Sequence, residues 1–343
     1  MRTPAPSVDP ARLLELIDAF SGVRALVFGD LIADEFIYGE IARVSREAPV
    51  LILNYDSTQI VPGGAGNAAN NVAALGASAV AIGVTGRDDT GSRLLEAMRP
   101  GVDLRSVVRA RGLGTPTKTR ILAGGIHSAK QQVVRIDRVA GDGISDADRH
   151  AIATRLLKAA ARCDALLVSD YGSGLVTPAL VARAHRALRR QRGRLSPVLV
   201  DSRYTLLKFR NMTTCTPNES EVEQMFGIRI GENTRVLERA GRELLRRTRA
   251  AAVLITRGSR GMALFEPDKP TAHIPIVGSD QIADVTGAGD TVIATMTLAL
   301  AAGARFIEAA HLANYAGGLV VMKRGTATIS ADELRHAVLS GRE

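Results

Sequence analysis

The segment Asp284–Asp290, DVTGAGD, combines residues that could transfer a proton beside a bound anion. Gly287, Ala288 and Gly289 stand at the expected start of an uncharged helix, where small residues leave backbone N–H groups accessible to an anion. Asp290 follows them and could take the proton of an attacking hydroxyl group during phosphoryl transfer. We therefore expect Asp290 to be a general base and the three small residues to form an anion hole. The alternative is that Asp290 only caps the helix.

A second segment, Pro62–Asn71 (PGGAGNAANN), has the composition of a site that contacts a polar ligand closely. Gly63 and Gly64 let the backbone approach a ligand, and the amide of Asn67 can donate to and accept from hydroxyl groups. The phosphate-binding patterns G-x-G-x-x-G and G-x-x-x-x-G-K-[ST] do not occur in the chain. A tight turn followed by a helix cap is the alternative use of these residues.

Two carboxylates, Asp30 and Asp34, follow the first expected strand in the segment GDLIAD. Open α/β sheets bind their ligands at the carboxyl ends of the strands. Either side chain could therefore bind a pair of hydroxyl groups, although a turn or a helix cap would use the same residues.

The segment Thr216–Glu221 (TPNESE) places Asn218 and Glu221 three positions apart, on one face of a helix that Pro217 is expected to start. A carboxylate in this position could hold the water ligands of a Mg²⁺ ion bound to nucleotide phosphates. A capping arrangement of the two side chains is the simpler alternative.

The elements that must position these residues alternate between short apolar strands and amphipathic helices. This alternation predicts an α/β fold with a mostly parallel sheet covered on both faces. The chain after Asp290 is expected to be mainly helical, with breaks at Gly303 and Gly325. We expect strands at Arg24–Asp30, Ser78–Val84, Ala165–Tyr171, Pro197–Asp201 and Ala251–Thr256, and helices at about Asn67–Leu75, Asp146–Arg162, Pro178–Arg192 and Thr234–Arg249.

Two segments, Phe36–Val61 and Pro116–Val139, break this rhythm and have the polar alternation of strand–turn–strand pairs. A second, small sheet inserted into the α/β unit accounts for both. With no internal repeat and no long linker, one core domain with a β-sheet lid is the economical interpretation.

The composition excludes several classes of protein. Hydrophobic residues make up 46% and charged residues 23% of the 343 positions, which excludes bulk disorder. The uncharged stretch Thr291–Ala304 is too short to span a bilayer, and we see no signal peptide. Only Cys163 and Cys215 are present, so we expect buried thiols in a reduced, cytoplasmic protein. The net charge of +9 is spread over helix-like segments, and with 3% aromatic residues we expect no nucleic-acid partner.

Taken together and in this order, the motifs resemble the ribokinase-like (PfkB) carbohydrate kinase family over nearly the whole chain. The resemblance rests on Gly63-Gly64 with Asn67, on Asn218-x-x-Glu221 and on the Asp284–Asp290 signature. The segments Thr256–Gly261 and Ala313–Gly318 match the adenine side of the family's nucleotide site. The resemblance implies one kinase domain over 1–343, built as a three-layer α/β/α sandwich with a β lid, that transfers the γ-phosphoryl group of ATP to a sugar hydroxyl.

The resemblance also implies roles for individual residues. Asp290 would be the base, Asn218 and Glu221 would serve the Mg²⁺–phosphate region, and Asp34 with Asn67 would hold the sugar. Asp284 and the backbone near 320–325 would line a monovalent-cation site where a member binds K⁺. The substrate side would comprise Asp30, Asp34, Gly63, Gly64, Asn67, Lys118, Arg120, Asp170 and Arg203, and the ATP side Asn218, Glu221, Thr256, Gly258, Gly261, Asn314 and Gly317.

Within the family, the chain is most similar to the heptose-7-phosphate kinases. The similarity lies in Gly29-Asp30, Val44-Ser45 with Glu47–Val50, Pro62–Ala65, Thr117–Arg120, Gln131-Gln132 with Arg135–Asp137, Ser169–Tyr171 and Asp284-Val285. That branch phosphorylates the anomeric hydroxyl of D-glycero-D-manno-heptose 7-phosphate, on the way to the ADP-heptose of lipopolysaccharide. Lys118 and Arg120 alternate in one expected strand, so both should point to one face and could clamp a phosphate on the substrate. An exposed basic strand is the alternative.

Two departures affect that clamp. The branch carries Asp-Pro-Lys-Gly where this chain has Asp201–Tyr204, and a lysine after Asp-Tyr where this chain has Gly172–Gly174. Arg203 could replace one of the two lysines. The chain has no His-x-Gly-His motif, so we expect a separate nucleotidyltransferase to act later. We expect a homodimer, and we keep three alternatives open: a kinase of an unphosphorylated sugar, sugar acid or nucleoside, a non-catalytic sugar-binding regulator and a nucleic-acid binder.

Overall fold

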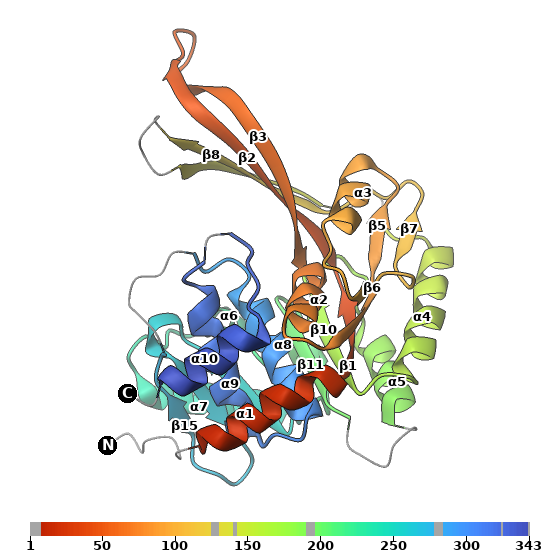
Figure 1. The fold of residues 1–343 in the computed structure, drawn as a ribbon, viewed down its shortest axis with the longest axis vertical. Coiled ribbons are helices and arrows are strands. Elements are labelled where there is room, and N and C mark those ends of the chain that lie inside the picture. The colour runs from red at the N-terminus through yellow and green to blue at the C-terminus, as the bar shows by residue number, and fades with distance from the viewer. Residues whose placement is uncertain are drawn as a thin grey trace.

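A nine-stranded sheet forms the centre of the computed structural model, which describes residues 8–124, 130–139, 143–189, 196–277, 284–323 and 325–341 (Figure 1). Its order is β15-β14-β13-β12-β11-β10-β1-β4-β6, parallel from β6 to β13 and antiparallel beyond. The strands are β1 (Arg24–Gly29), β4 (Ser78–Ile82), β6 (Val102–Asp103), β10 (Ala165–Asp170), β11 (Val198–Ser202), β12 (Thr214–Cys215), β13 (Ala252–Thr256), β14 (Met262–Phe265) and β15 (Ala272–Ile274). The central strands are buried on both faces, which explains their unbroken apolar runs.

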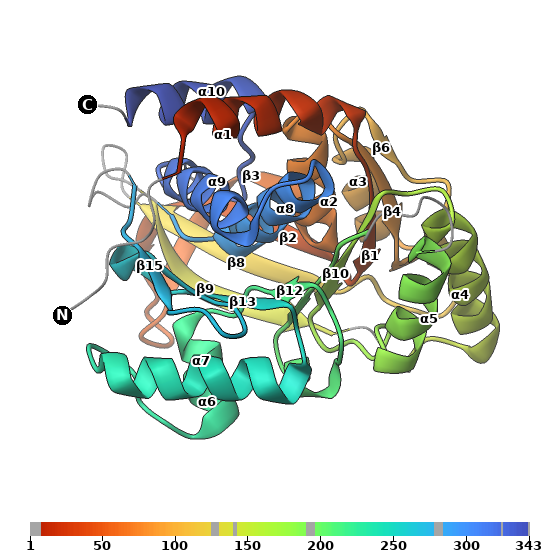
Figure 2. The same cartoon turned by 90° about the horizontal axis from the view of Figure 1, so that it is seen from below.

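Helices cover both faces of this sheet, as Figure 2 shows. One apolar core lies under α1 (Pro10–Asp18), α2 (Ala65–Ala74), α8 (Ala288–Ala301), α9 (Phe306–Val320) and α10 (Ala331–Ser340). The other lies under α4 (Asp146–Ala160), α5 (Pro178–Arg189), α6 (Glu219–Phe226) and α7 (Thr234–Thr248). The expected three-layer α/β/α arrangement is therefore confirmed. Short 3₁₀ turns occur at Ala19–Gly22, Leu206–Lys208 and Gly258–Arg260.

Four further strands form a second sheet, the lid sheet, that projects from the core in Figure 1. They are β2 (Leu31–Val44), β3 (Leu51–Gly64), β8 (Thr117–Gly124) and β9 (Gln131–Arg138), in the order β3-β2-β8-β9. Strands β2 and β8 are parallel, whereas the outer pairs are antiparallel. The small sheet agrees with the sequence prediction, but β2 and β3 extend to Leu31 and Gly64, beyond the expected limits of 36 and 61. The link 125–129 lies outside the described residues.

One expected element differs from the structure for a local reason, and another reaches the edge of the described residues. The expected strand Ser78–Val84 is split at Gly83, and β5 (Val84–Gly86) pairs with β7 (Val108–Ala110) in a separate two-stranded sheet beside α3 (Asp89–Glu96). The expected helix Pro178–Arg192 is described only to Arg189, because 190–195 lie outside the described residues. Cys163 and Cys215 are free and buried.

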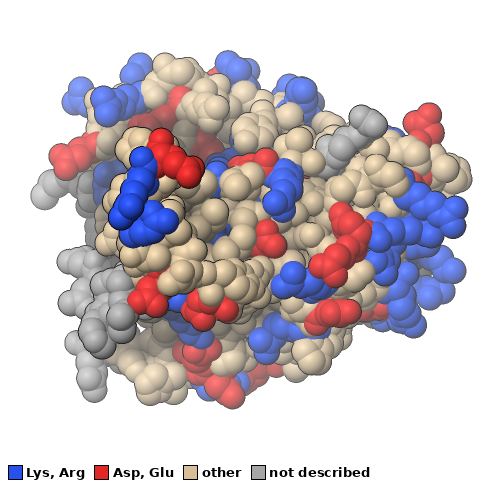
Figure 3. Space-filling model, turned by 90° about the horizontal axis from the view of Figure 1, so that it is seen from above, with Lys and Arg blue, Asp and Glu red and all other residues tan. Residues whose placement is uncertain are grey.

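Charge is distributed unevenly over the surface. On the face drawn in Figure 3, acidic and basic side chains are mixed over most of the area, and Lys and Arg gather toward the right-hand side. None of the helices within the described ranges has both the length and the apolar character that a membrane crossing requires.

Candidate active site

A cavity of about 420 Å³ opens at the carboxyl ends of β10 and β11, beside the start of α8. This is the edge at which parallel α/β sheets bind ligands. The expected anion loop, the expected base and all residues expected on the ATP side line this one cavity. Its lining includes Asp170, Tyr171, Asp201, Arg203, Asn218, Glu221, Thr256, Gly258, Gly261, Gly287, Ala288, Gly289, Asp290, Asn314 and Gly317.

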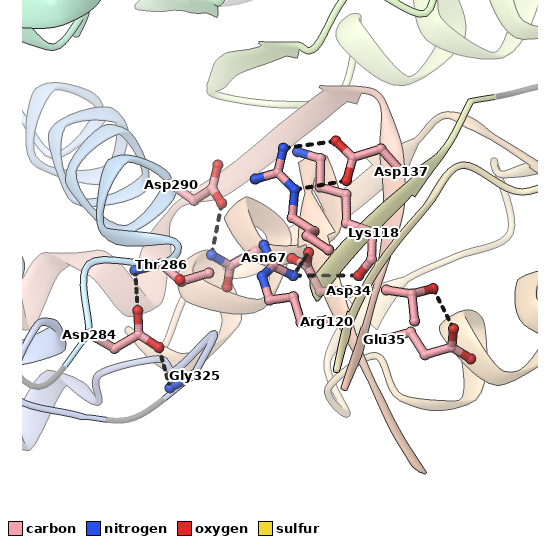
Figure 4. A network of polar contacts seen from close by, with 12 residues as sticks. Asp34, Glu35, Asn67, Lys118, Arg120, Asp137, Asp284, Thr286, Asp290 and Gly325 are labelled. Atoms are coloured by element: carbon pink, nitrogen blue, oxygen red, sulfur yellow. Dashed lines mark hydrogen bonds and ion pairs between the residues drawn. The ribbon is translucent and has the colours of Figure 1, made fainter. Parts of the chain in front are cut away.

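Asp290 lies in the first turn of α8 and is only 4% exposed. The N-cap residue of this helix is Gly287, with φ of 80°, and no side chain caps the helix. The capping alternative for Asp290 is therefore wrong. Its carboxylate instead accepts a hydrogen bond of 2.8 Å from Asn67 Nδ2 (Figure 4). Its other oxygen accepts a bond of 3.5 Å from the Tyr171 hydroxyl.

Burial raises the pKa of Asp290 to about 7, and the negative charge of Asp34 adds to the rise. The hydrogen bond from Asn67 and the positive charge of Lys118 act in the opposite direction and lower it. A carboxyl group with a pKa near neutrality is well matched to general-base catalysis, because it is substantially ionised yet still basic. The arrangement can therefore accept the proton of a hydroxyl group that enters the cavity.

Asn67 does not have the free amide that the sequence suggested for a ligand. Its Nδ2 donates to Asp290, and its Oδ1 accepts a bond of 3.1 Å from Asn71, whose own Oδ1 accepts from Thr291 Oγ1 at 2.9 Å. Asn67 is buried in α2, which begins at Ala65 with Gly64 as its N-cap, so the helix-cap part of the alternative is confirmed, whereas β3 leads into the helix without a separate turn. The polar network locks α2 to α8 and positions the carboxylate of Asp290.

The anion loop is held in shape by contacts of its own. Ala288 donates its backbone N–H to the carbonyl of Val285 at 3.2 Å. This N–H was expected to be free for an anion, but it is already hydrogen-bonded. Within the described part of the chain, the N–H groups of Gly287 and Gly289 meet no acceptor. Gly287 needs its positive φ, and a Cβ there would lie 2.6 Å from Asn67 Nδ2.

Asp30 and Asp34 are both buried but serve different contacts. Asp30 follows β1 and accepts from the backbone N–H of Tyr171 at 2.7 Å and from the hydroxyl of Ser173. Burial raises its pKa. Asp30 does not line the cavity, and its contacts fix the loop after β10, so its expected role in substrate binding stays a prediction. Asp34 lies on the lid strand β2, not at the edge of β1, and forms an ion pair of 2.5 Å with Arg120.

Gly63 is required because the Asp34 side chain lies directly over it, where a Cβ would overlap the carboxylate. Gly64 ends β3 with φ of 56°. Neither glycine lines the cavity, so the structure gives them packing contacts with the lid and with the start of α2.

The two lid cations point toward the site, as their alternation predicted. Arg120 reaches Asp34 (Figure 4). Lys118 Nζ lies 4.6 Å from the centroid of the Tyr171 ring, whereas the hydroxyl of Thr119, between the two cations, donates to Glu35 at 2.6 Å. Burial lowers the pKa of Lys118. The alternative of an exposed basic strand does not describe these two side chains.

Asn218 and Glu221 form a capping box at the start of α6, with bonds of 2.9 and 3.0 Å. The helix begins at Glu219 and not at Pro217, because Asn218 occupies the N-cap. The capping interpretation is thus correct, yet both residues also line the cavity. Burial raises the pKa of Glu221.

The sequence matches the profile of the pfkB family carbohydrate kinases over residues 26–333. The chain belongs to this family. It is 41% identical over 316 residues to the bifunctional protein HldE of Geobacter metallireducens, covering 91% of this chain and 62% of that protein. It is 39% identical over 324 residues to HldE of Caulobacter vibrioides, covering 94% and 65%. The chain thus spans less than two thirds of the length of these relatives.

Solved kinase structures share the fold. Arabidopsis thaliana ribokinase complexed with ribose and ATP superposes with a TM-score of 0.67 at 21% identity, covering 93% of this chain and 98% of that one. Phosphofructokinase-2 of Escherichia coli, in complex with substrates and products, gives a TM-score of 0.71 at 20% identity, covering 94% and 99%. At these identities the likeness is one of fold.

Two residues that line the cavity of this carbohydrate kinase, Asp201 and Tyr171, were not predicted as site residues from the sequence. Asp201 is the last residue but one of β11 and lines the cavity, and burial raises its pKa well above the ordinary value, with Glu221 adding to the rise. The charge of Asp290 raises the pKa of Tyr171. Both lie at the carboxyl ends of apolar strands of the central sheet, Asp201 within β11 and Tyr171 just after β10, and this position was the available signal.

Two further carboxylates of the kinase hold loops. Asp170 accepts from Ser202 Oγ at 2.6 Å and from Thr205 Oγ1 at 3.0 Å while lining the cavity. Asp284 accepts from the N–H of Thr286 at 2.9 Å and of Gly325 at 3.0 Å. Burial alone would raise the pKa of Asp284, but these bonds lower it.

Proposed function

We propose that the chain is an ATP-dependent sugar kinase that phosphorylates the anomeric hydroxyl of D-glycero-D-manno-heptose 7-phosphate to the 1,7-bisphosphate. The observation that carries the proposal is Asp290, a buried carboxylate with a pKa near 7 beside the anion loop of one cavity. The similarity to the HldE proteins supports the heptose, and the lid cations support a phosphorylated substrate.

In the proposed reaction, Asp290 accepts the proton of the sugar hydroxyl. The resulting oxygen attacks the γ-phosphorus of ATP, a new P–O bond forms to the sugar, and the bond to the β-phosphate oxygen breaks to release ADP. The N–H groups of Gly287 and Gly289 stabilise charge on the transferring group. Lining residues such as Met262 and Val321 offer an apolar wall for adenine near Asn314 and Gly317.

Mg²⁺ would neutralise the negative charge of the ATP phosphates, and the residues present fit it. Mg²⁺ is commonly held by one or two carboxylates together with water and substrate phosphates. Glu221 and Asp201 line the cavity. No group of three or more metal-binding side chains occurs in the described ranges, which suits an ion brought in with its nucleotide. We propose Asp284 with the 320–325 backbone as a K⁺ site on resemblance alone.

We further propose that the chain is one kinase domain whose lid sheet closes over the sugar and pairs with a second copy. The lid exposes large apolar side chains, among them Val44, Tyr55, Val134 and Ile136, at 43–69%. Closure would exclude water as a competing acceptor. Hydrogen exchange of the lid strands should slow on adding sugar and a nucleotide analogue, and sedimentation should give a dimer that Val134→Glu weakens. We place the protein in the cytoplasm, where free thiols stay reduced.

The alternative substrate is an unphosphorylated sugar, sugar acid or nucleoside. It is favoured by the fact that Arg120 is already paired with Asp34, which leaves it less available to a substrate phosphate. A phosphoryl-transfer assay with ATP against a panel of sugars and sugar phosphates decides between the two. Turnover at least tenfold faster with heptose 7-phosphate than with any unphosphorylated sugar supports the proposal. The reverse order, or no turnover with any sugar, contradicts it.

A further inference from the structure

A second hollow, of about 380 Å³, lies at the opposite end of the central strands from the catalytic cavity. Arg24, which begins β1, lines it, and so does Cys163, just before β10. The same two strands lead at their other ends to Asp30 and Asp170. The hollow is therefore separated from the phosphoryl-transfer cavity by the length of the sheet, and it shares no lining residue with it.

Positive charge dominates this hollow. Its lining holds five cationic side chains and one carboxylate: Arg24, Arg105, Arg155, Lys158, Arg162 and Asp103. Asp103 is paired with Arg105 at 2.6 Å and lies 3.9 Å from Arg24. Arg155 donates to the carbonyl of Val107 at 2.9 Å. Among the residues that the structure describes, Lys158 and Arg162 pair with no carboxylate, and the hydroxyl of Ser106 meets no acceptor.

Stabilisation of the α4 helix dipole accounts for only some of the cations that line this hollow. Lys158 lies in the last turn of α4 and Arg162 follows the helix, where positive charge stabilises the helix dipole. The helix dipole does not explain why Arg24 at the start of β1, Arg105 after β6 and Arg155 in an earlier turn of α4 line the same hollow. Like charges gathered around one concave space repel one another unless an anion offsets them.

We propose that this hollow binds a small phosphorylated molecule, at a site distinct from the catalytic cavity. Phosphate oxygens suit the donors that remain: the ammonium of Lys158, the guanidinium of Arg162 and the hydroxyl of Ser106. The volume of about 380 Å³ accommodates a compact ligand with one or two phosphate groups.

Titration calorimetry with Mg²⁺-free inorganic pyrophosphate tests the site directly. The variant Lys158→Gln/Arg162→Gln removes the two unpaired cations, and we expect it to raise the Kd at least tenfold, as the loss of charge-assisted contacts predicts. The matched control is Arg235→Gln/Arg239→Gln on α7, which removes two exposed cations with the same spacing. It should leave the Kd within about twofold, and so should Lys158→Arg.

A third variant separates this site from the catalytic cavity. Arg203→Gln removes a cation that lines the catalytic cavity. If the proposal is correct, this variant binds pyrophosphate at the second hollow with the Kd of the wild type. Loss of all binding in Arg203→Gln with full binding in Lys158→Gln/Arg162→Gln would place the anion in the catalytic cavity and overturn the proposal. An equal loss of pyrophosphate affinity in Lys158→Gln/Arg162→Gln and in the control Arg235→Gln/Arg239→Gln would also overturn the proposal. So would the absence of any heat of binding at about 10 mM pyrophosphate, a concentration that would fill a site of millimolar Kd. Thermal unfolding of each variant checks that the fold is retained.

Discussion

Asn67 Nδ2 donates a hydrogen bond of 2.8 Å to Oδ2 of Asp290, which joins α2 to α8, the helix that carries the base. The bond spans 223 positions of sequence and is buried. Because Asn67 donates to the ionised form of the carboxyl group, it holds the pKa of Asp290 below the value that burial alone would give. Asn67 is therefore a positioning residue for Asp290.

Replacing Asn67 should shift the pH dependence of catalysis. In Asn67→Ala the stabilisation of the carboxylate is lost, so the pKa of Asp290 should rise above about 7. The acid limb of the kcat/KM profile should then move to higher pH by about one to two units, the equivalent of about 1.5–3 kcal/mol. The matched control is Asn70→Ala in the same helix, since Asn70 bonds the N–H of Arg99 instead. A lower rate with an unmoved acid limb would contradict this role.

The variant Asp290→Asn should retain its fold and its affinity for nucleotide but lose its base. We expect kcat to fall by roughly 10²–10⁴-fold, as is typical when a general base is removed. Turnover is measured with ATP and the preferred sugar, and nucleotide affinity by calorimetry. Turnover within a factor of about three of wild type, in a normally folded variant, would exclude Asp290 as the base.

The same substitution should stabilise the protein in a pH-dependent manner. The pKa of Asp290 is about 7 in the folded protein and near 3.8 in the unfolded chain. Its contribution to folding stability is therefore fully present below about pH 4 and is lost as pH rises to about 7. Asparagine cannot ionise, so the stability gain of Asp290→Asn should grow over this range to the order of a few kcal/mol. Chemical denaturation at pH 5 and pH 8 measures it. An equal gain at both values would contradict the assigned pKa.

The central sheet could be predicted from sequence because its parallel strands are buried on both faces and appear as continuous apolar runs, such as ALLVSD in β10. The anion loop and Asp290 were found because they are contiguous in sequence. The contacts of Asn67 and Asp30 could not be found in that way. Both depend on groups more than 140 positions away, the side chain of Asp290 and the backbone N–H of Tyr171, and only the folded topology brings these together.

The predicted boundaries of the lid strands were wrong for a related reason. Strand β2 follows β1 after the single residue Asp30, so the chain passes from the central sheet into the lid without a turn signal. Asp34 was consequently placed at the edge of the first strand, whereas it belongs to the lid. Pairing of β2 with β8, which fixes this register, joins segments about 84 positions apart, as Asp34 and Lys118 show.

Two neighbouring glycines of the anion loop should respond differently to alanine. Gly287→Ala forces a positive φ on a residue with a Cβ and places that atom 2.6 Å from Asn67 Nδ2. We expect a loss of about 1–3 kcal/mol in the free energy of unfolding, together with lower turnover as Asn67 is displaced. At Gly289 a Cβ meets nothing within 4 Å, so Gly289→Ala is the control and should unfold at the same or a higher denaturant concentration. Equal stability of the two variants would contradict the structural reason given for Gly287.

Lys118 of the lid and Arg203 of the cavity lining should determine the affinity for the phosphate of the substrate. Lys118 lies over the Tyr171 ring and Arg203 lines the cavity, so both are near the hydroxyl group that Asp290 would activate. We expect Lys118→Ala or Arg203→Ala to raise the KM for heptose 7-phosphate about ten- to a hundredfold, because one charge-assisted contact contributes about 1.5–3 kcal/mol. The KM for ATP should change less than about threefold.

The control for this prediction is Lys130→Ala, which removes a lid cation that pairs with Asp56. Arg120→Ala is less informative, because it also leaves the buried carboxylate of Asp34 without its partner. Steady-state kinetics with heptose 7-phosphate and with its unphosphorylated analogue separate the contributions, since only the phosphorylated sugar should respond to the variants. An unchanged KM in both Lys118→Ala and Arg203→Ala would remove the phosphate clamp from the proposal. The assignments of Asp290 and of the anion loop do not depend on that clamp and would remain.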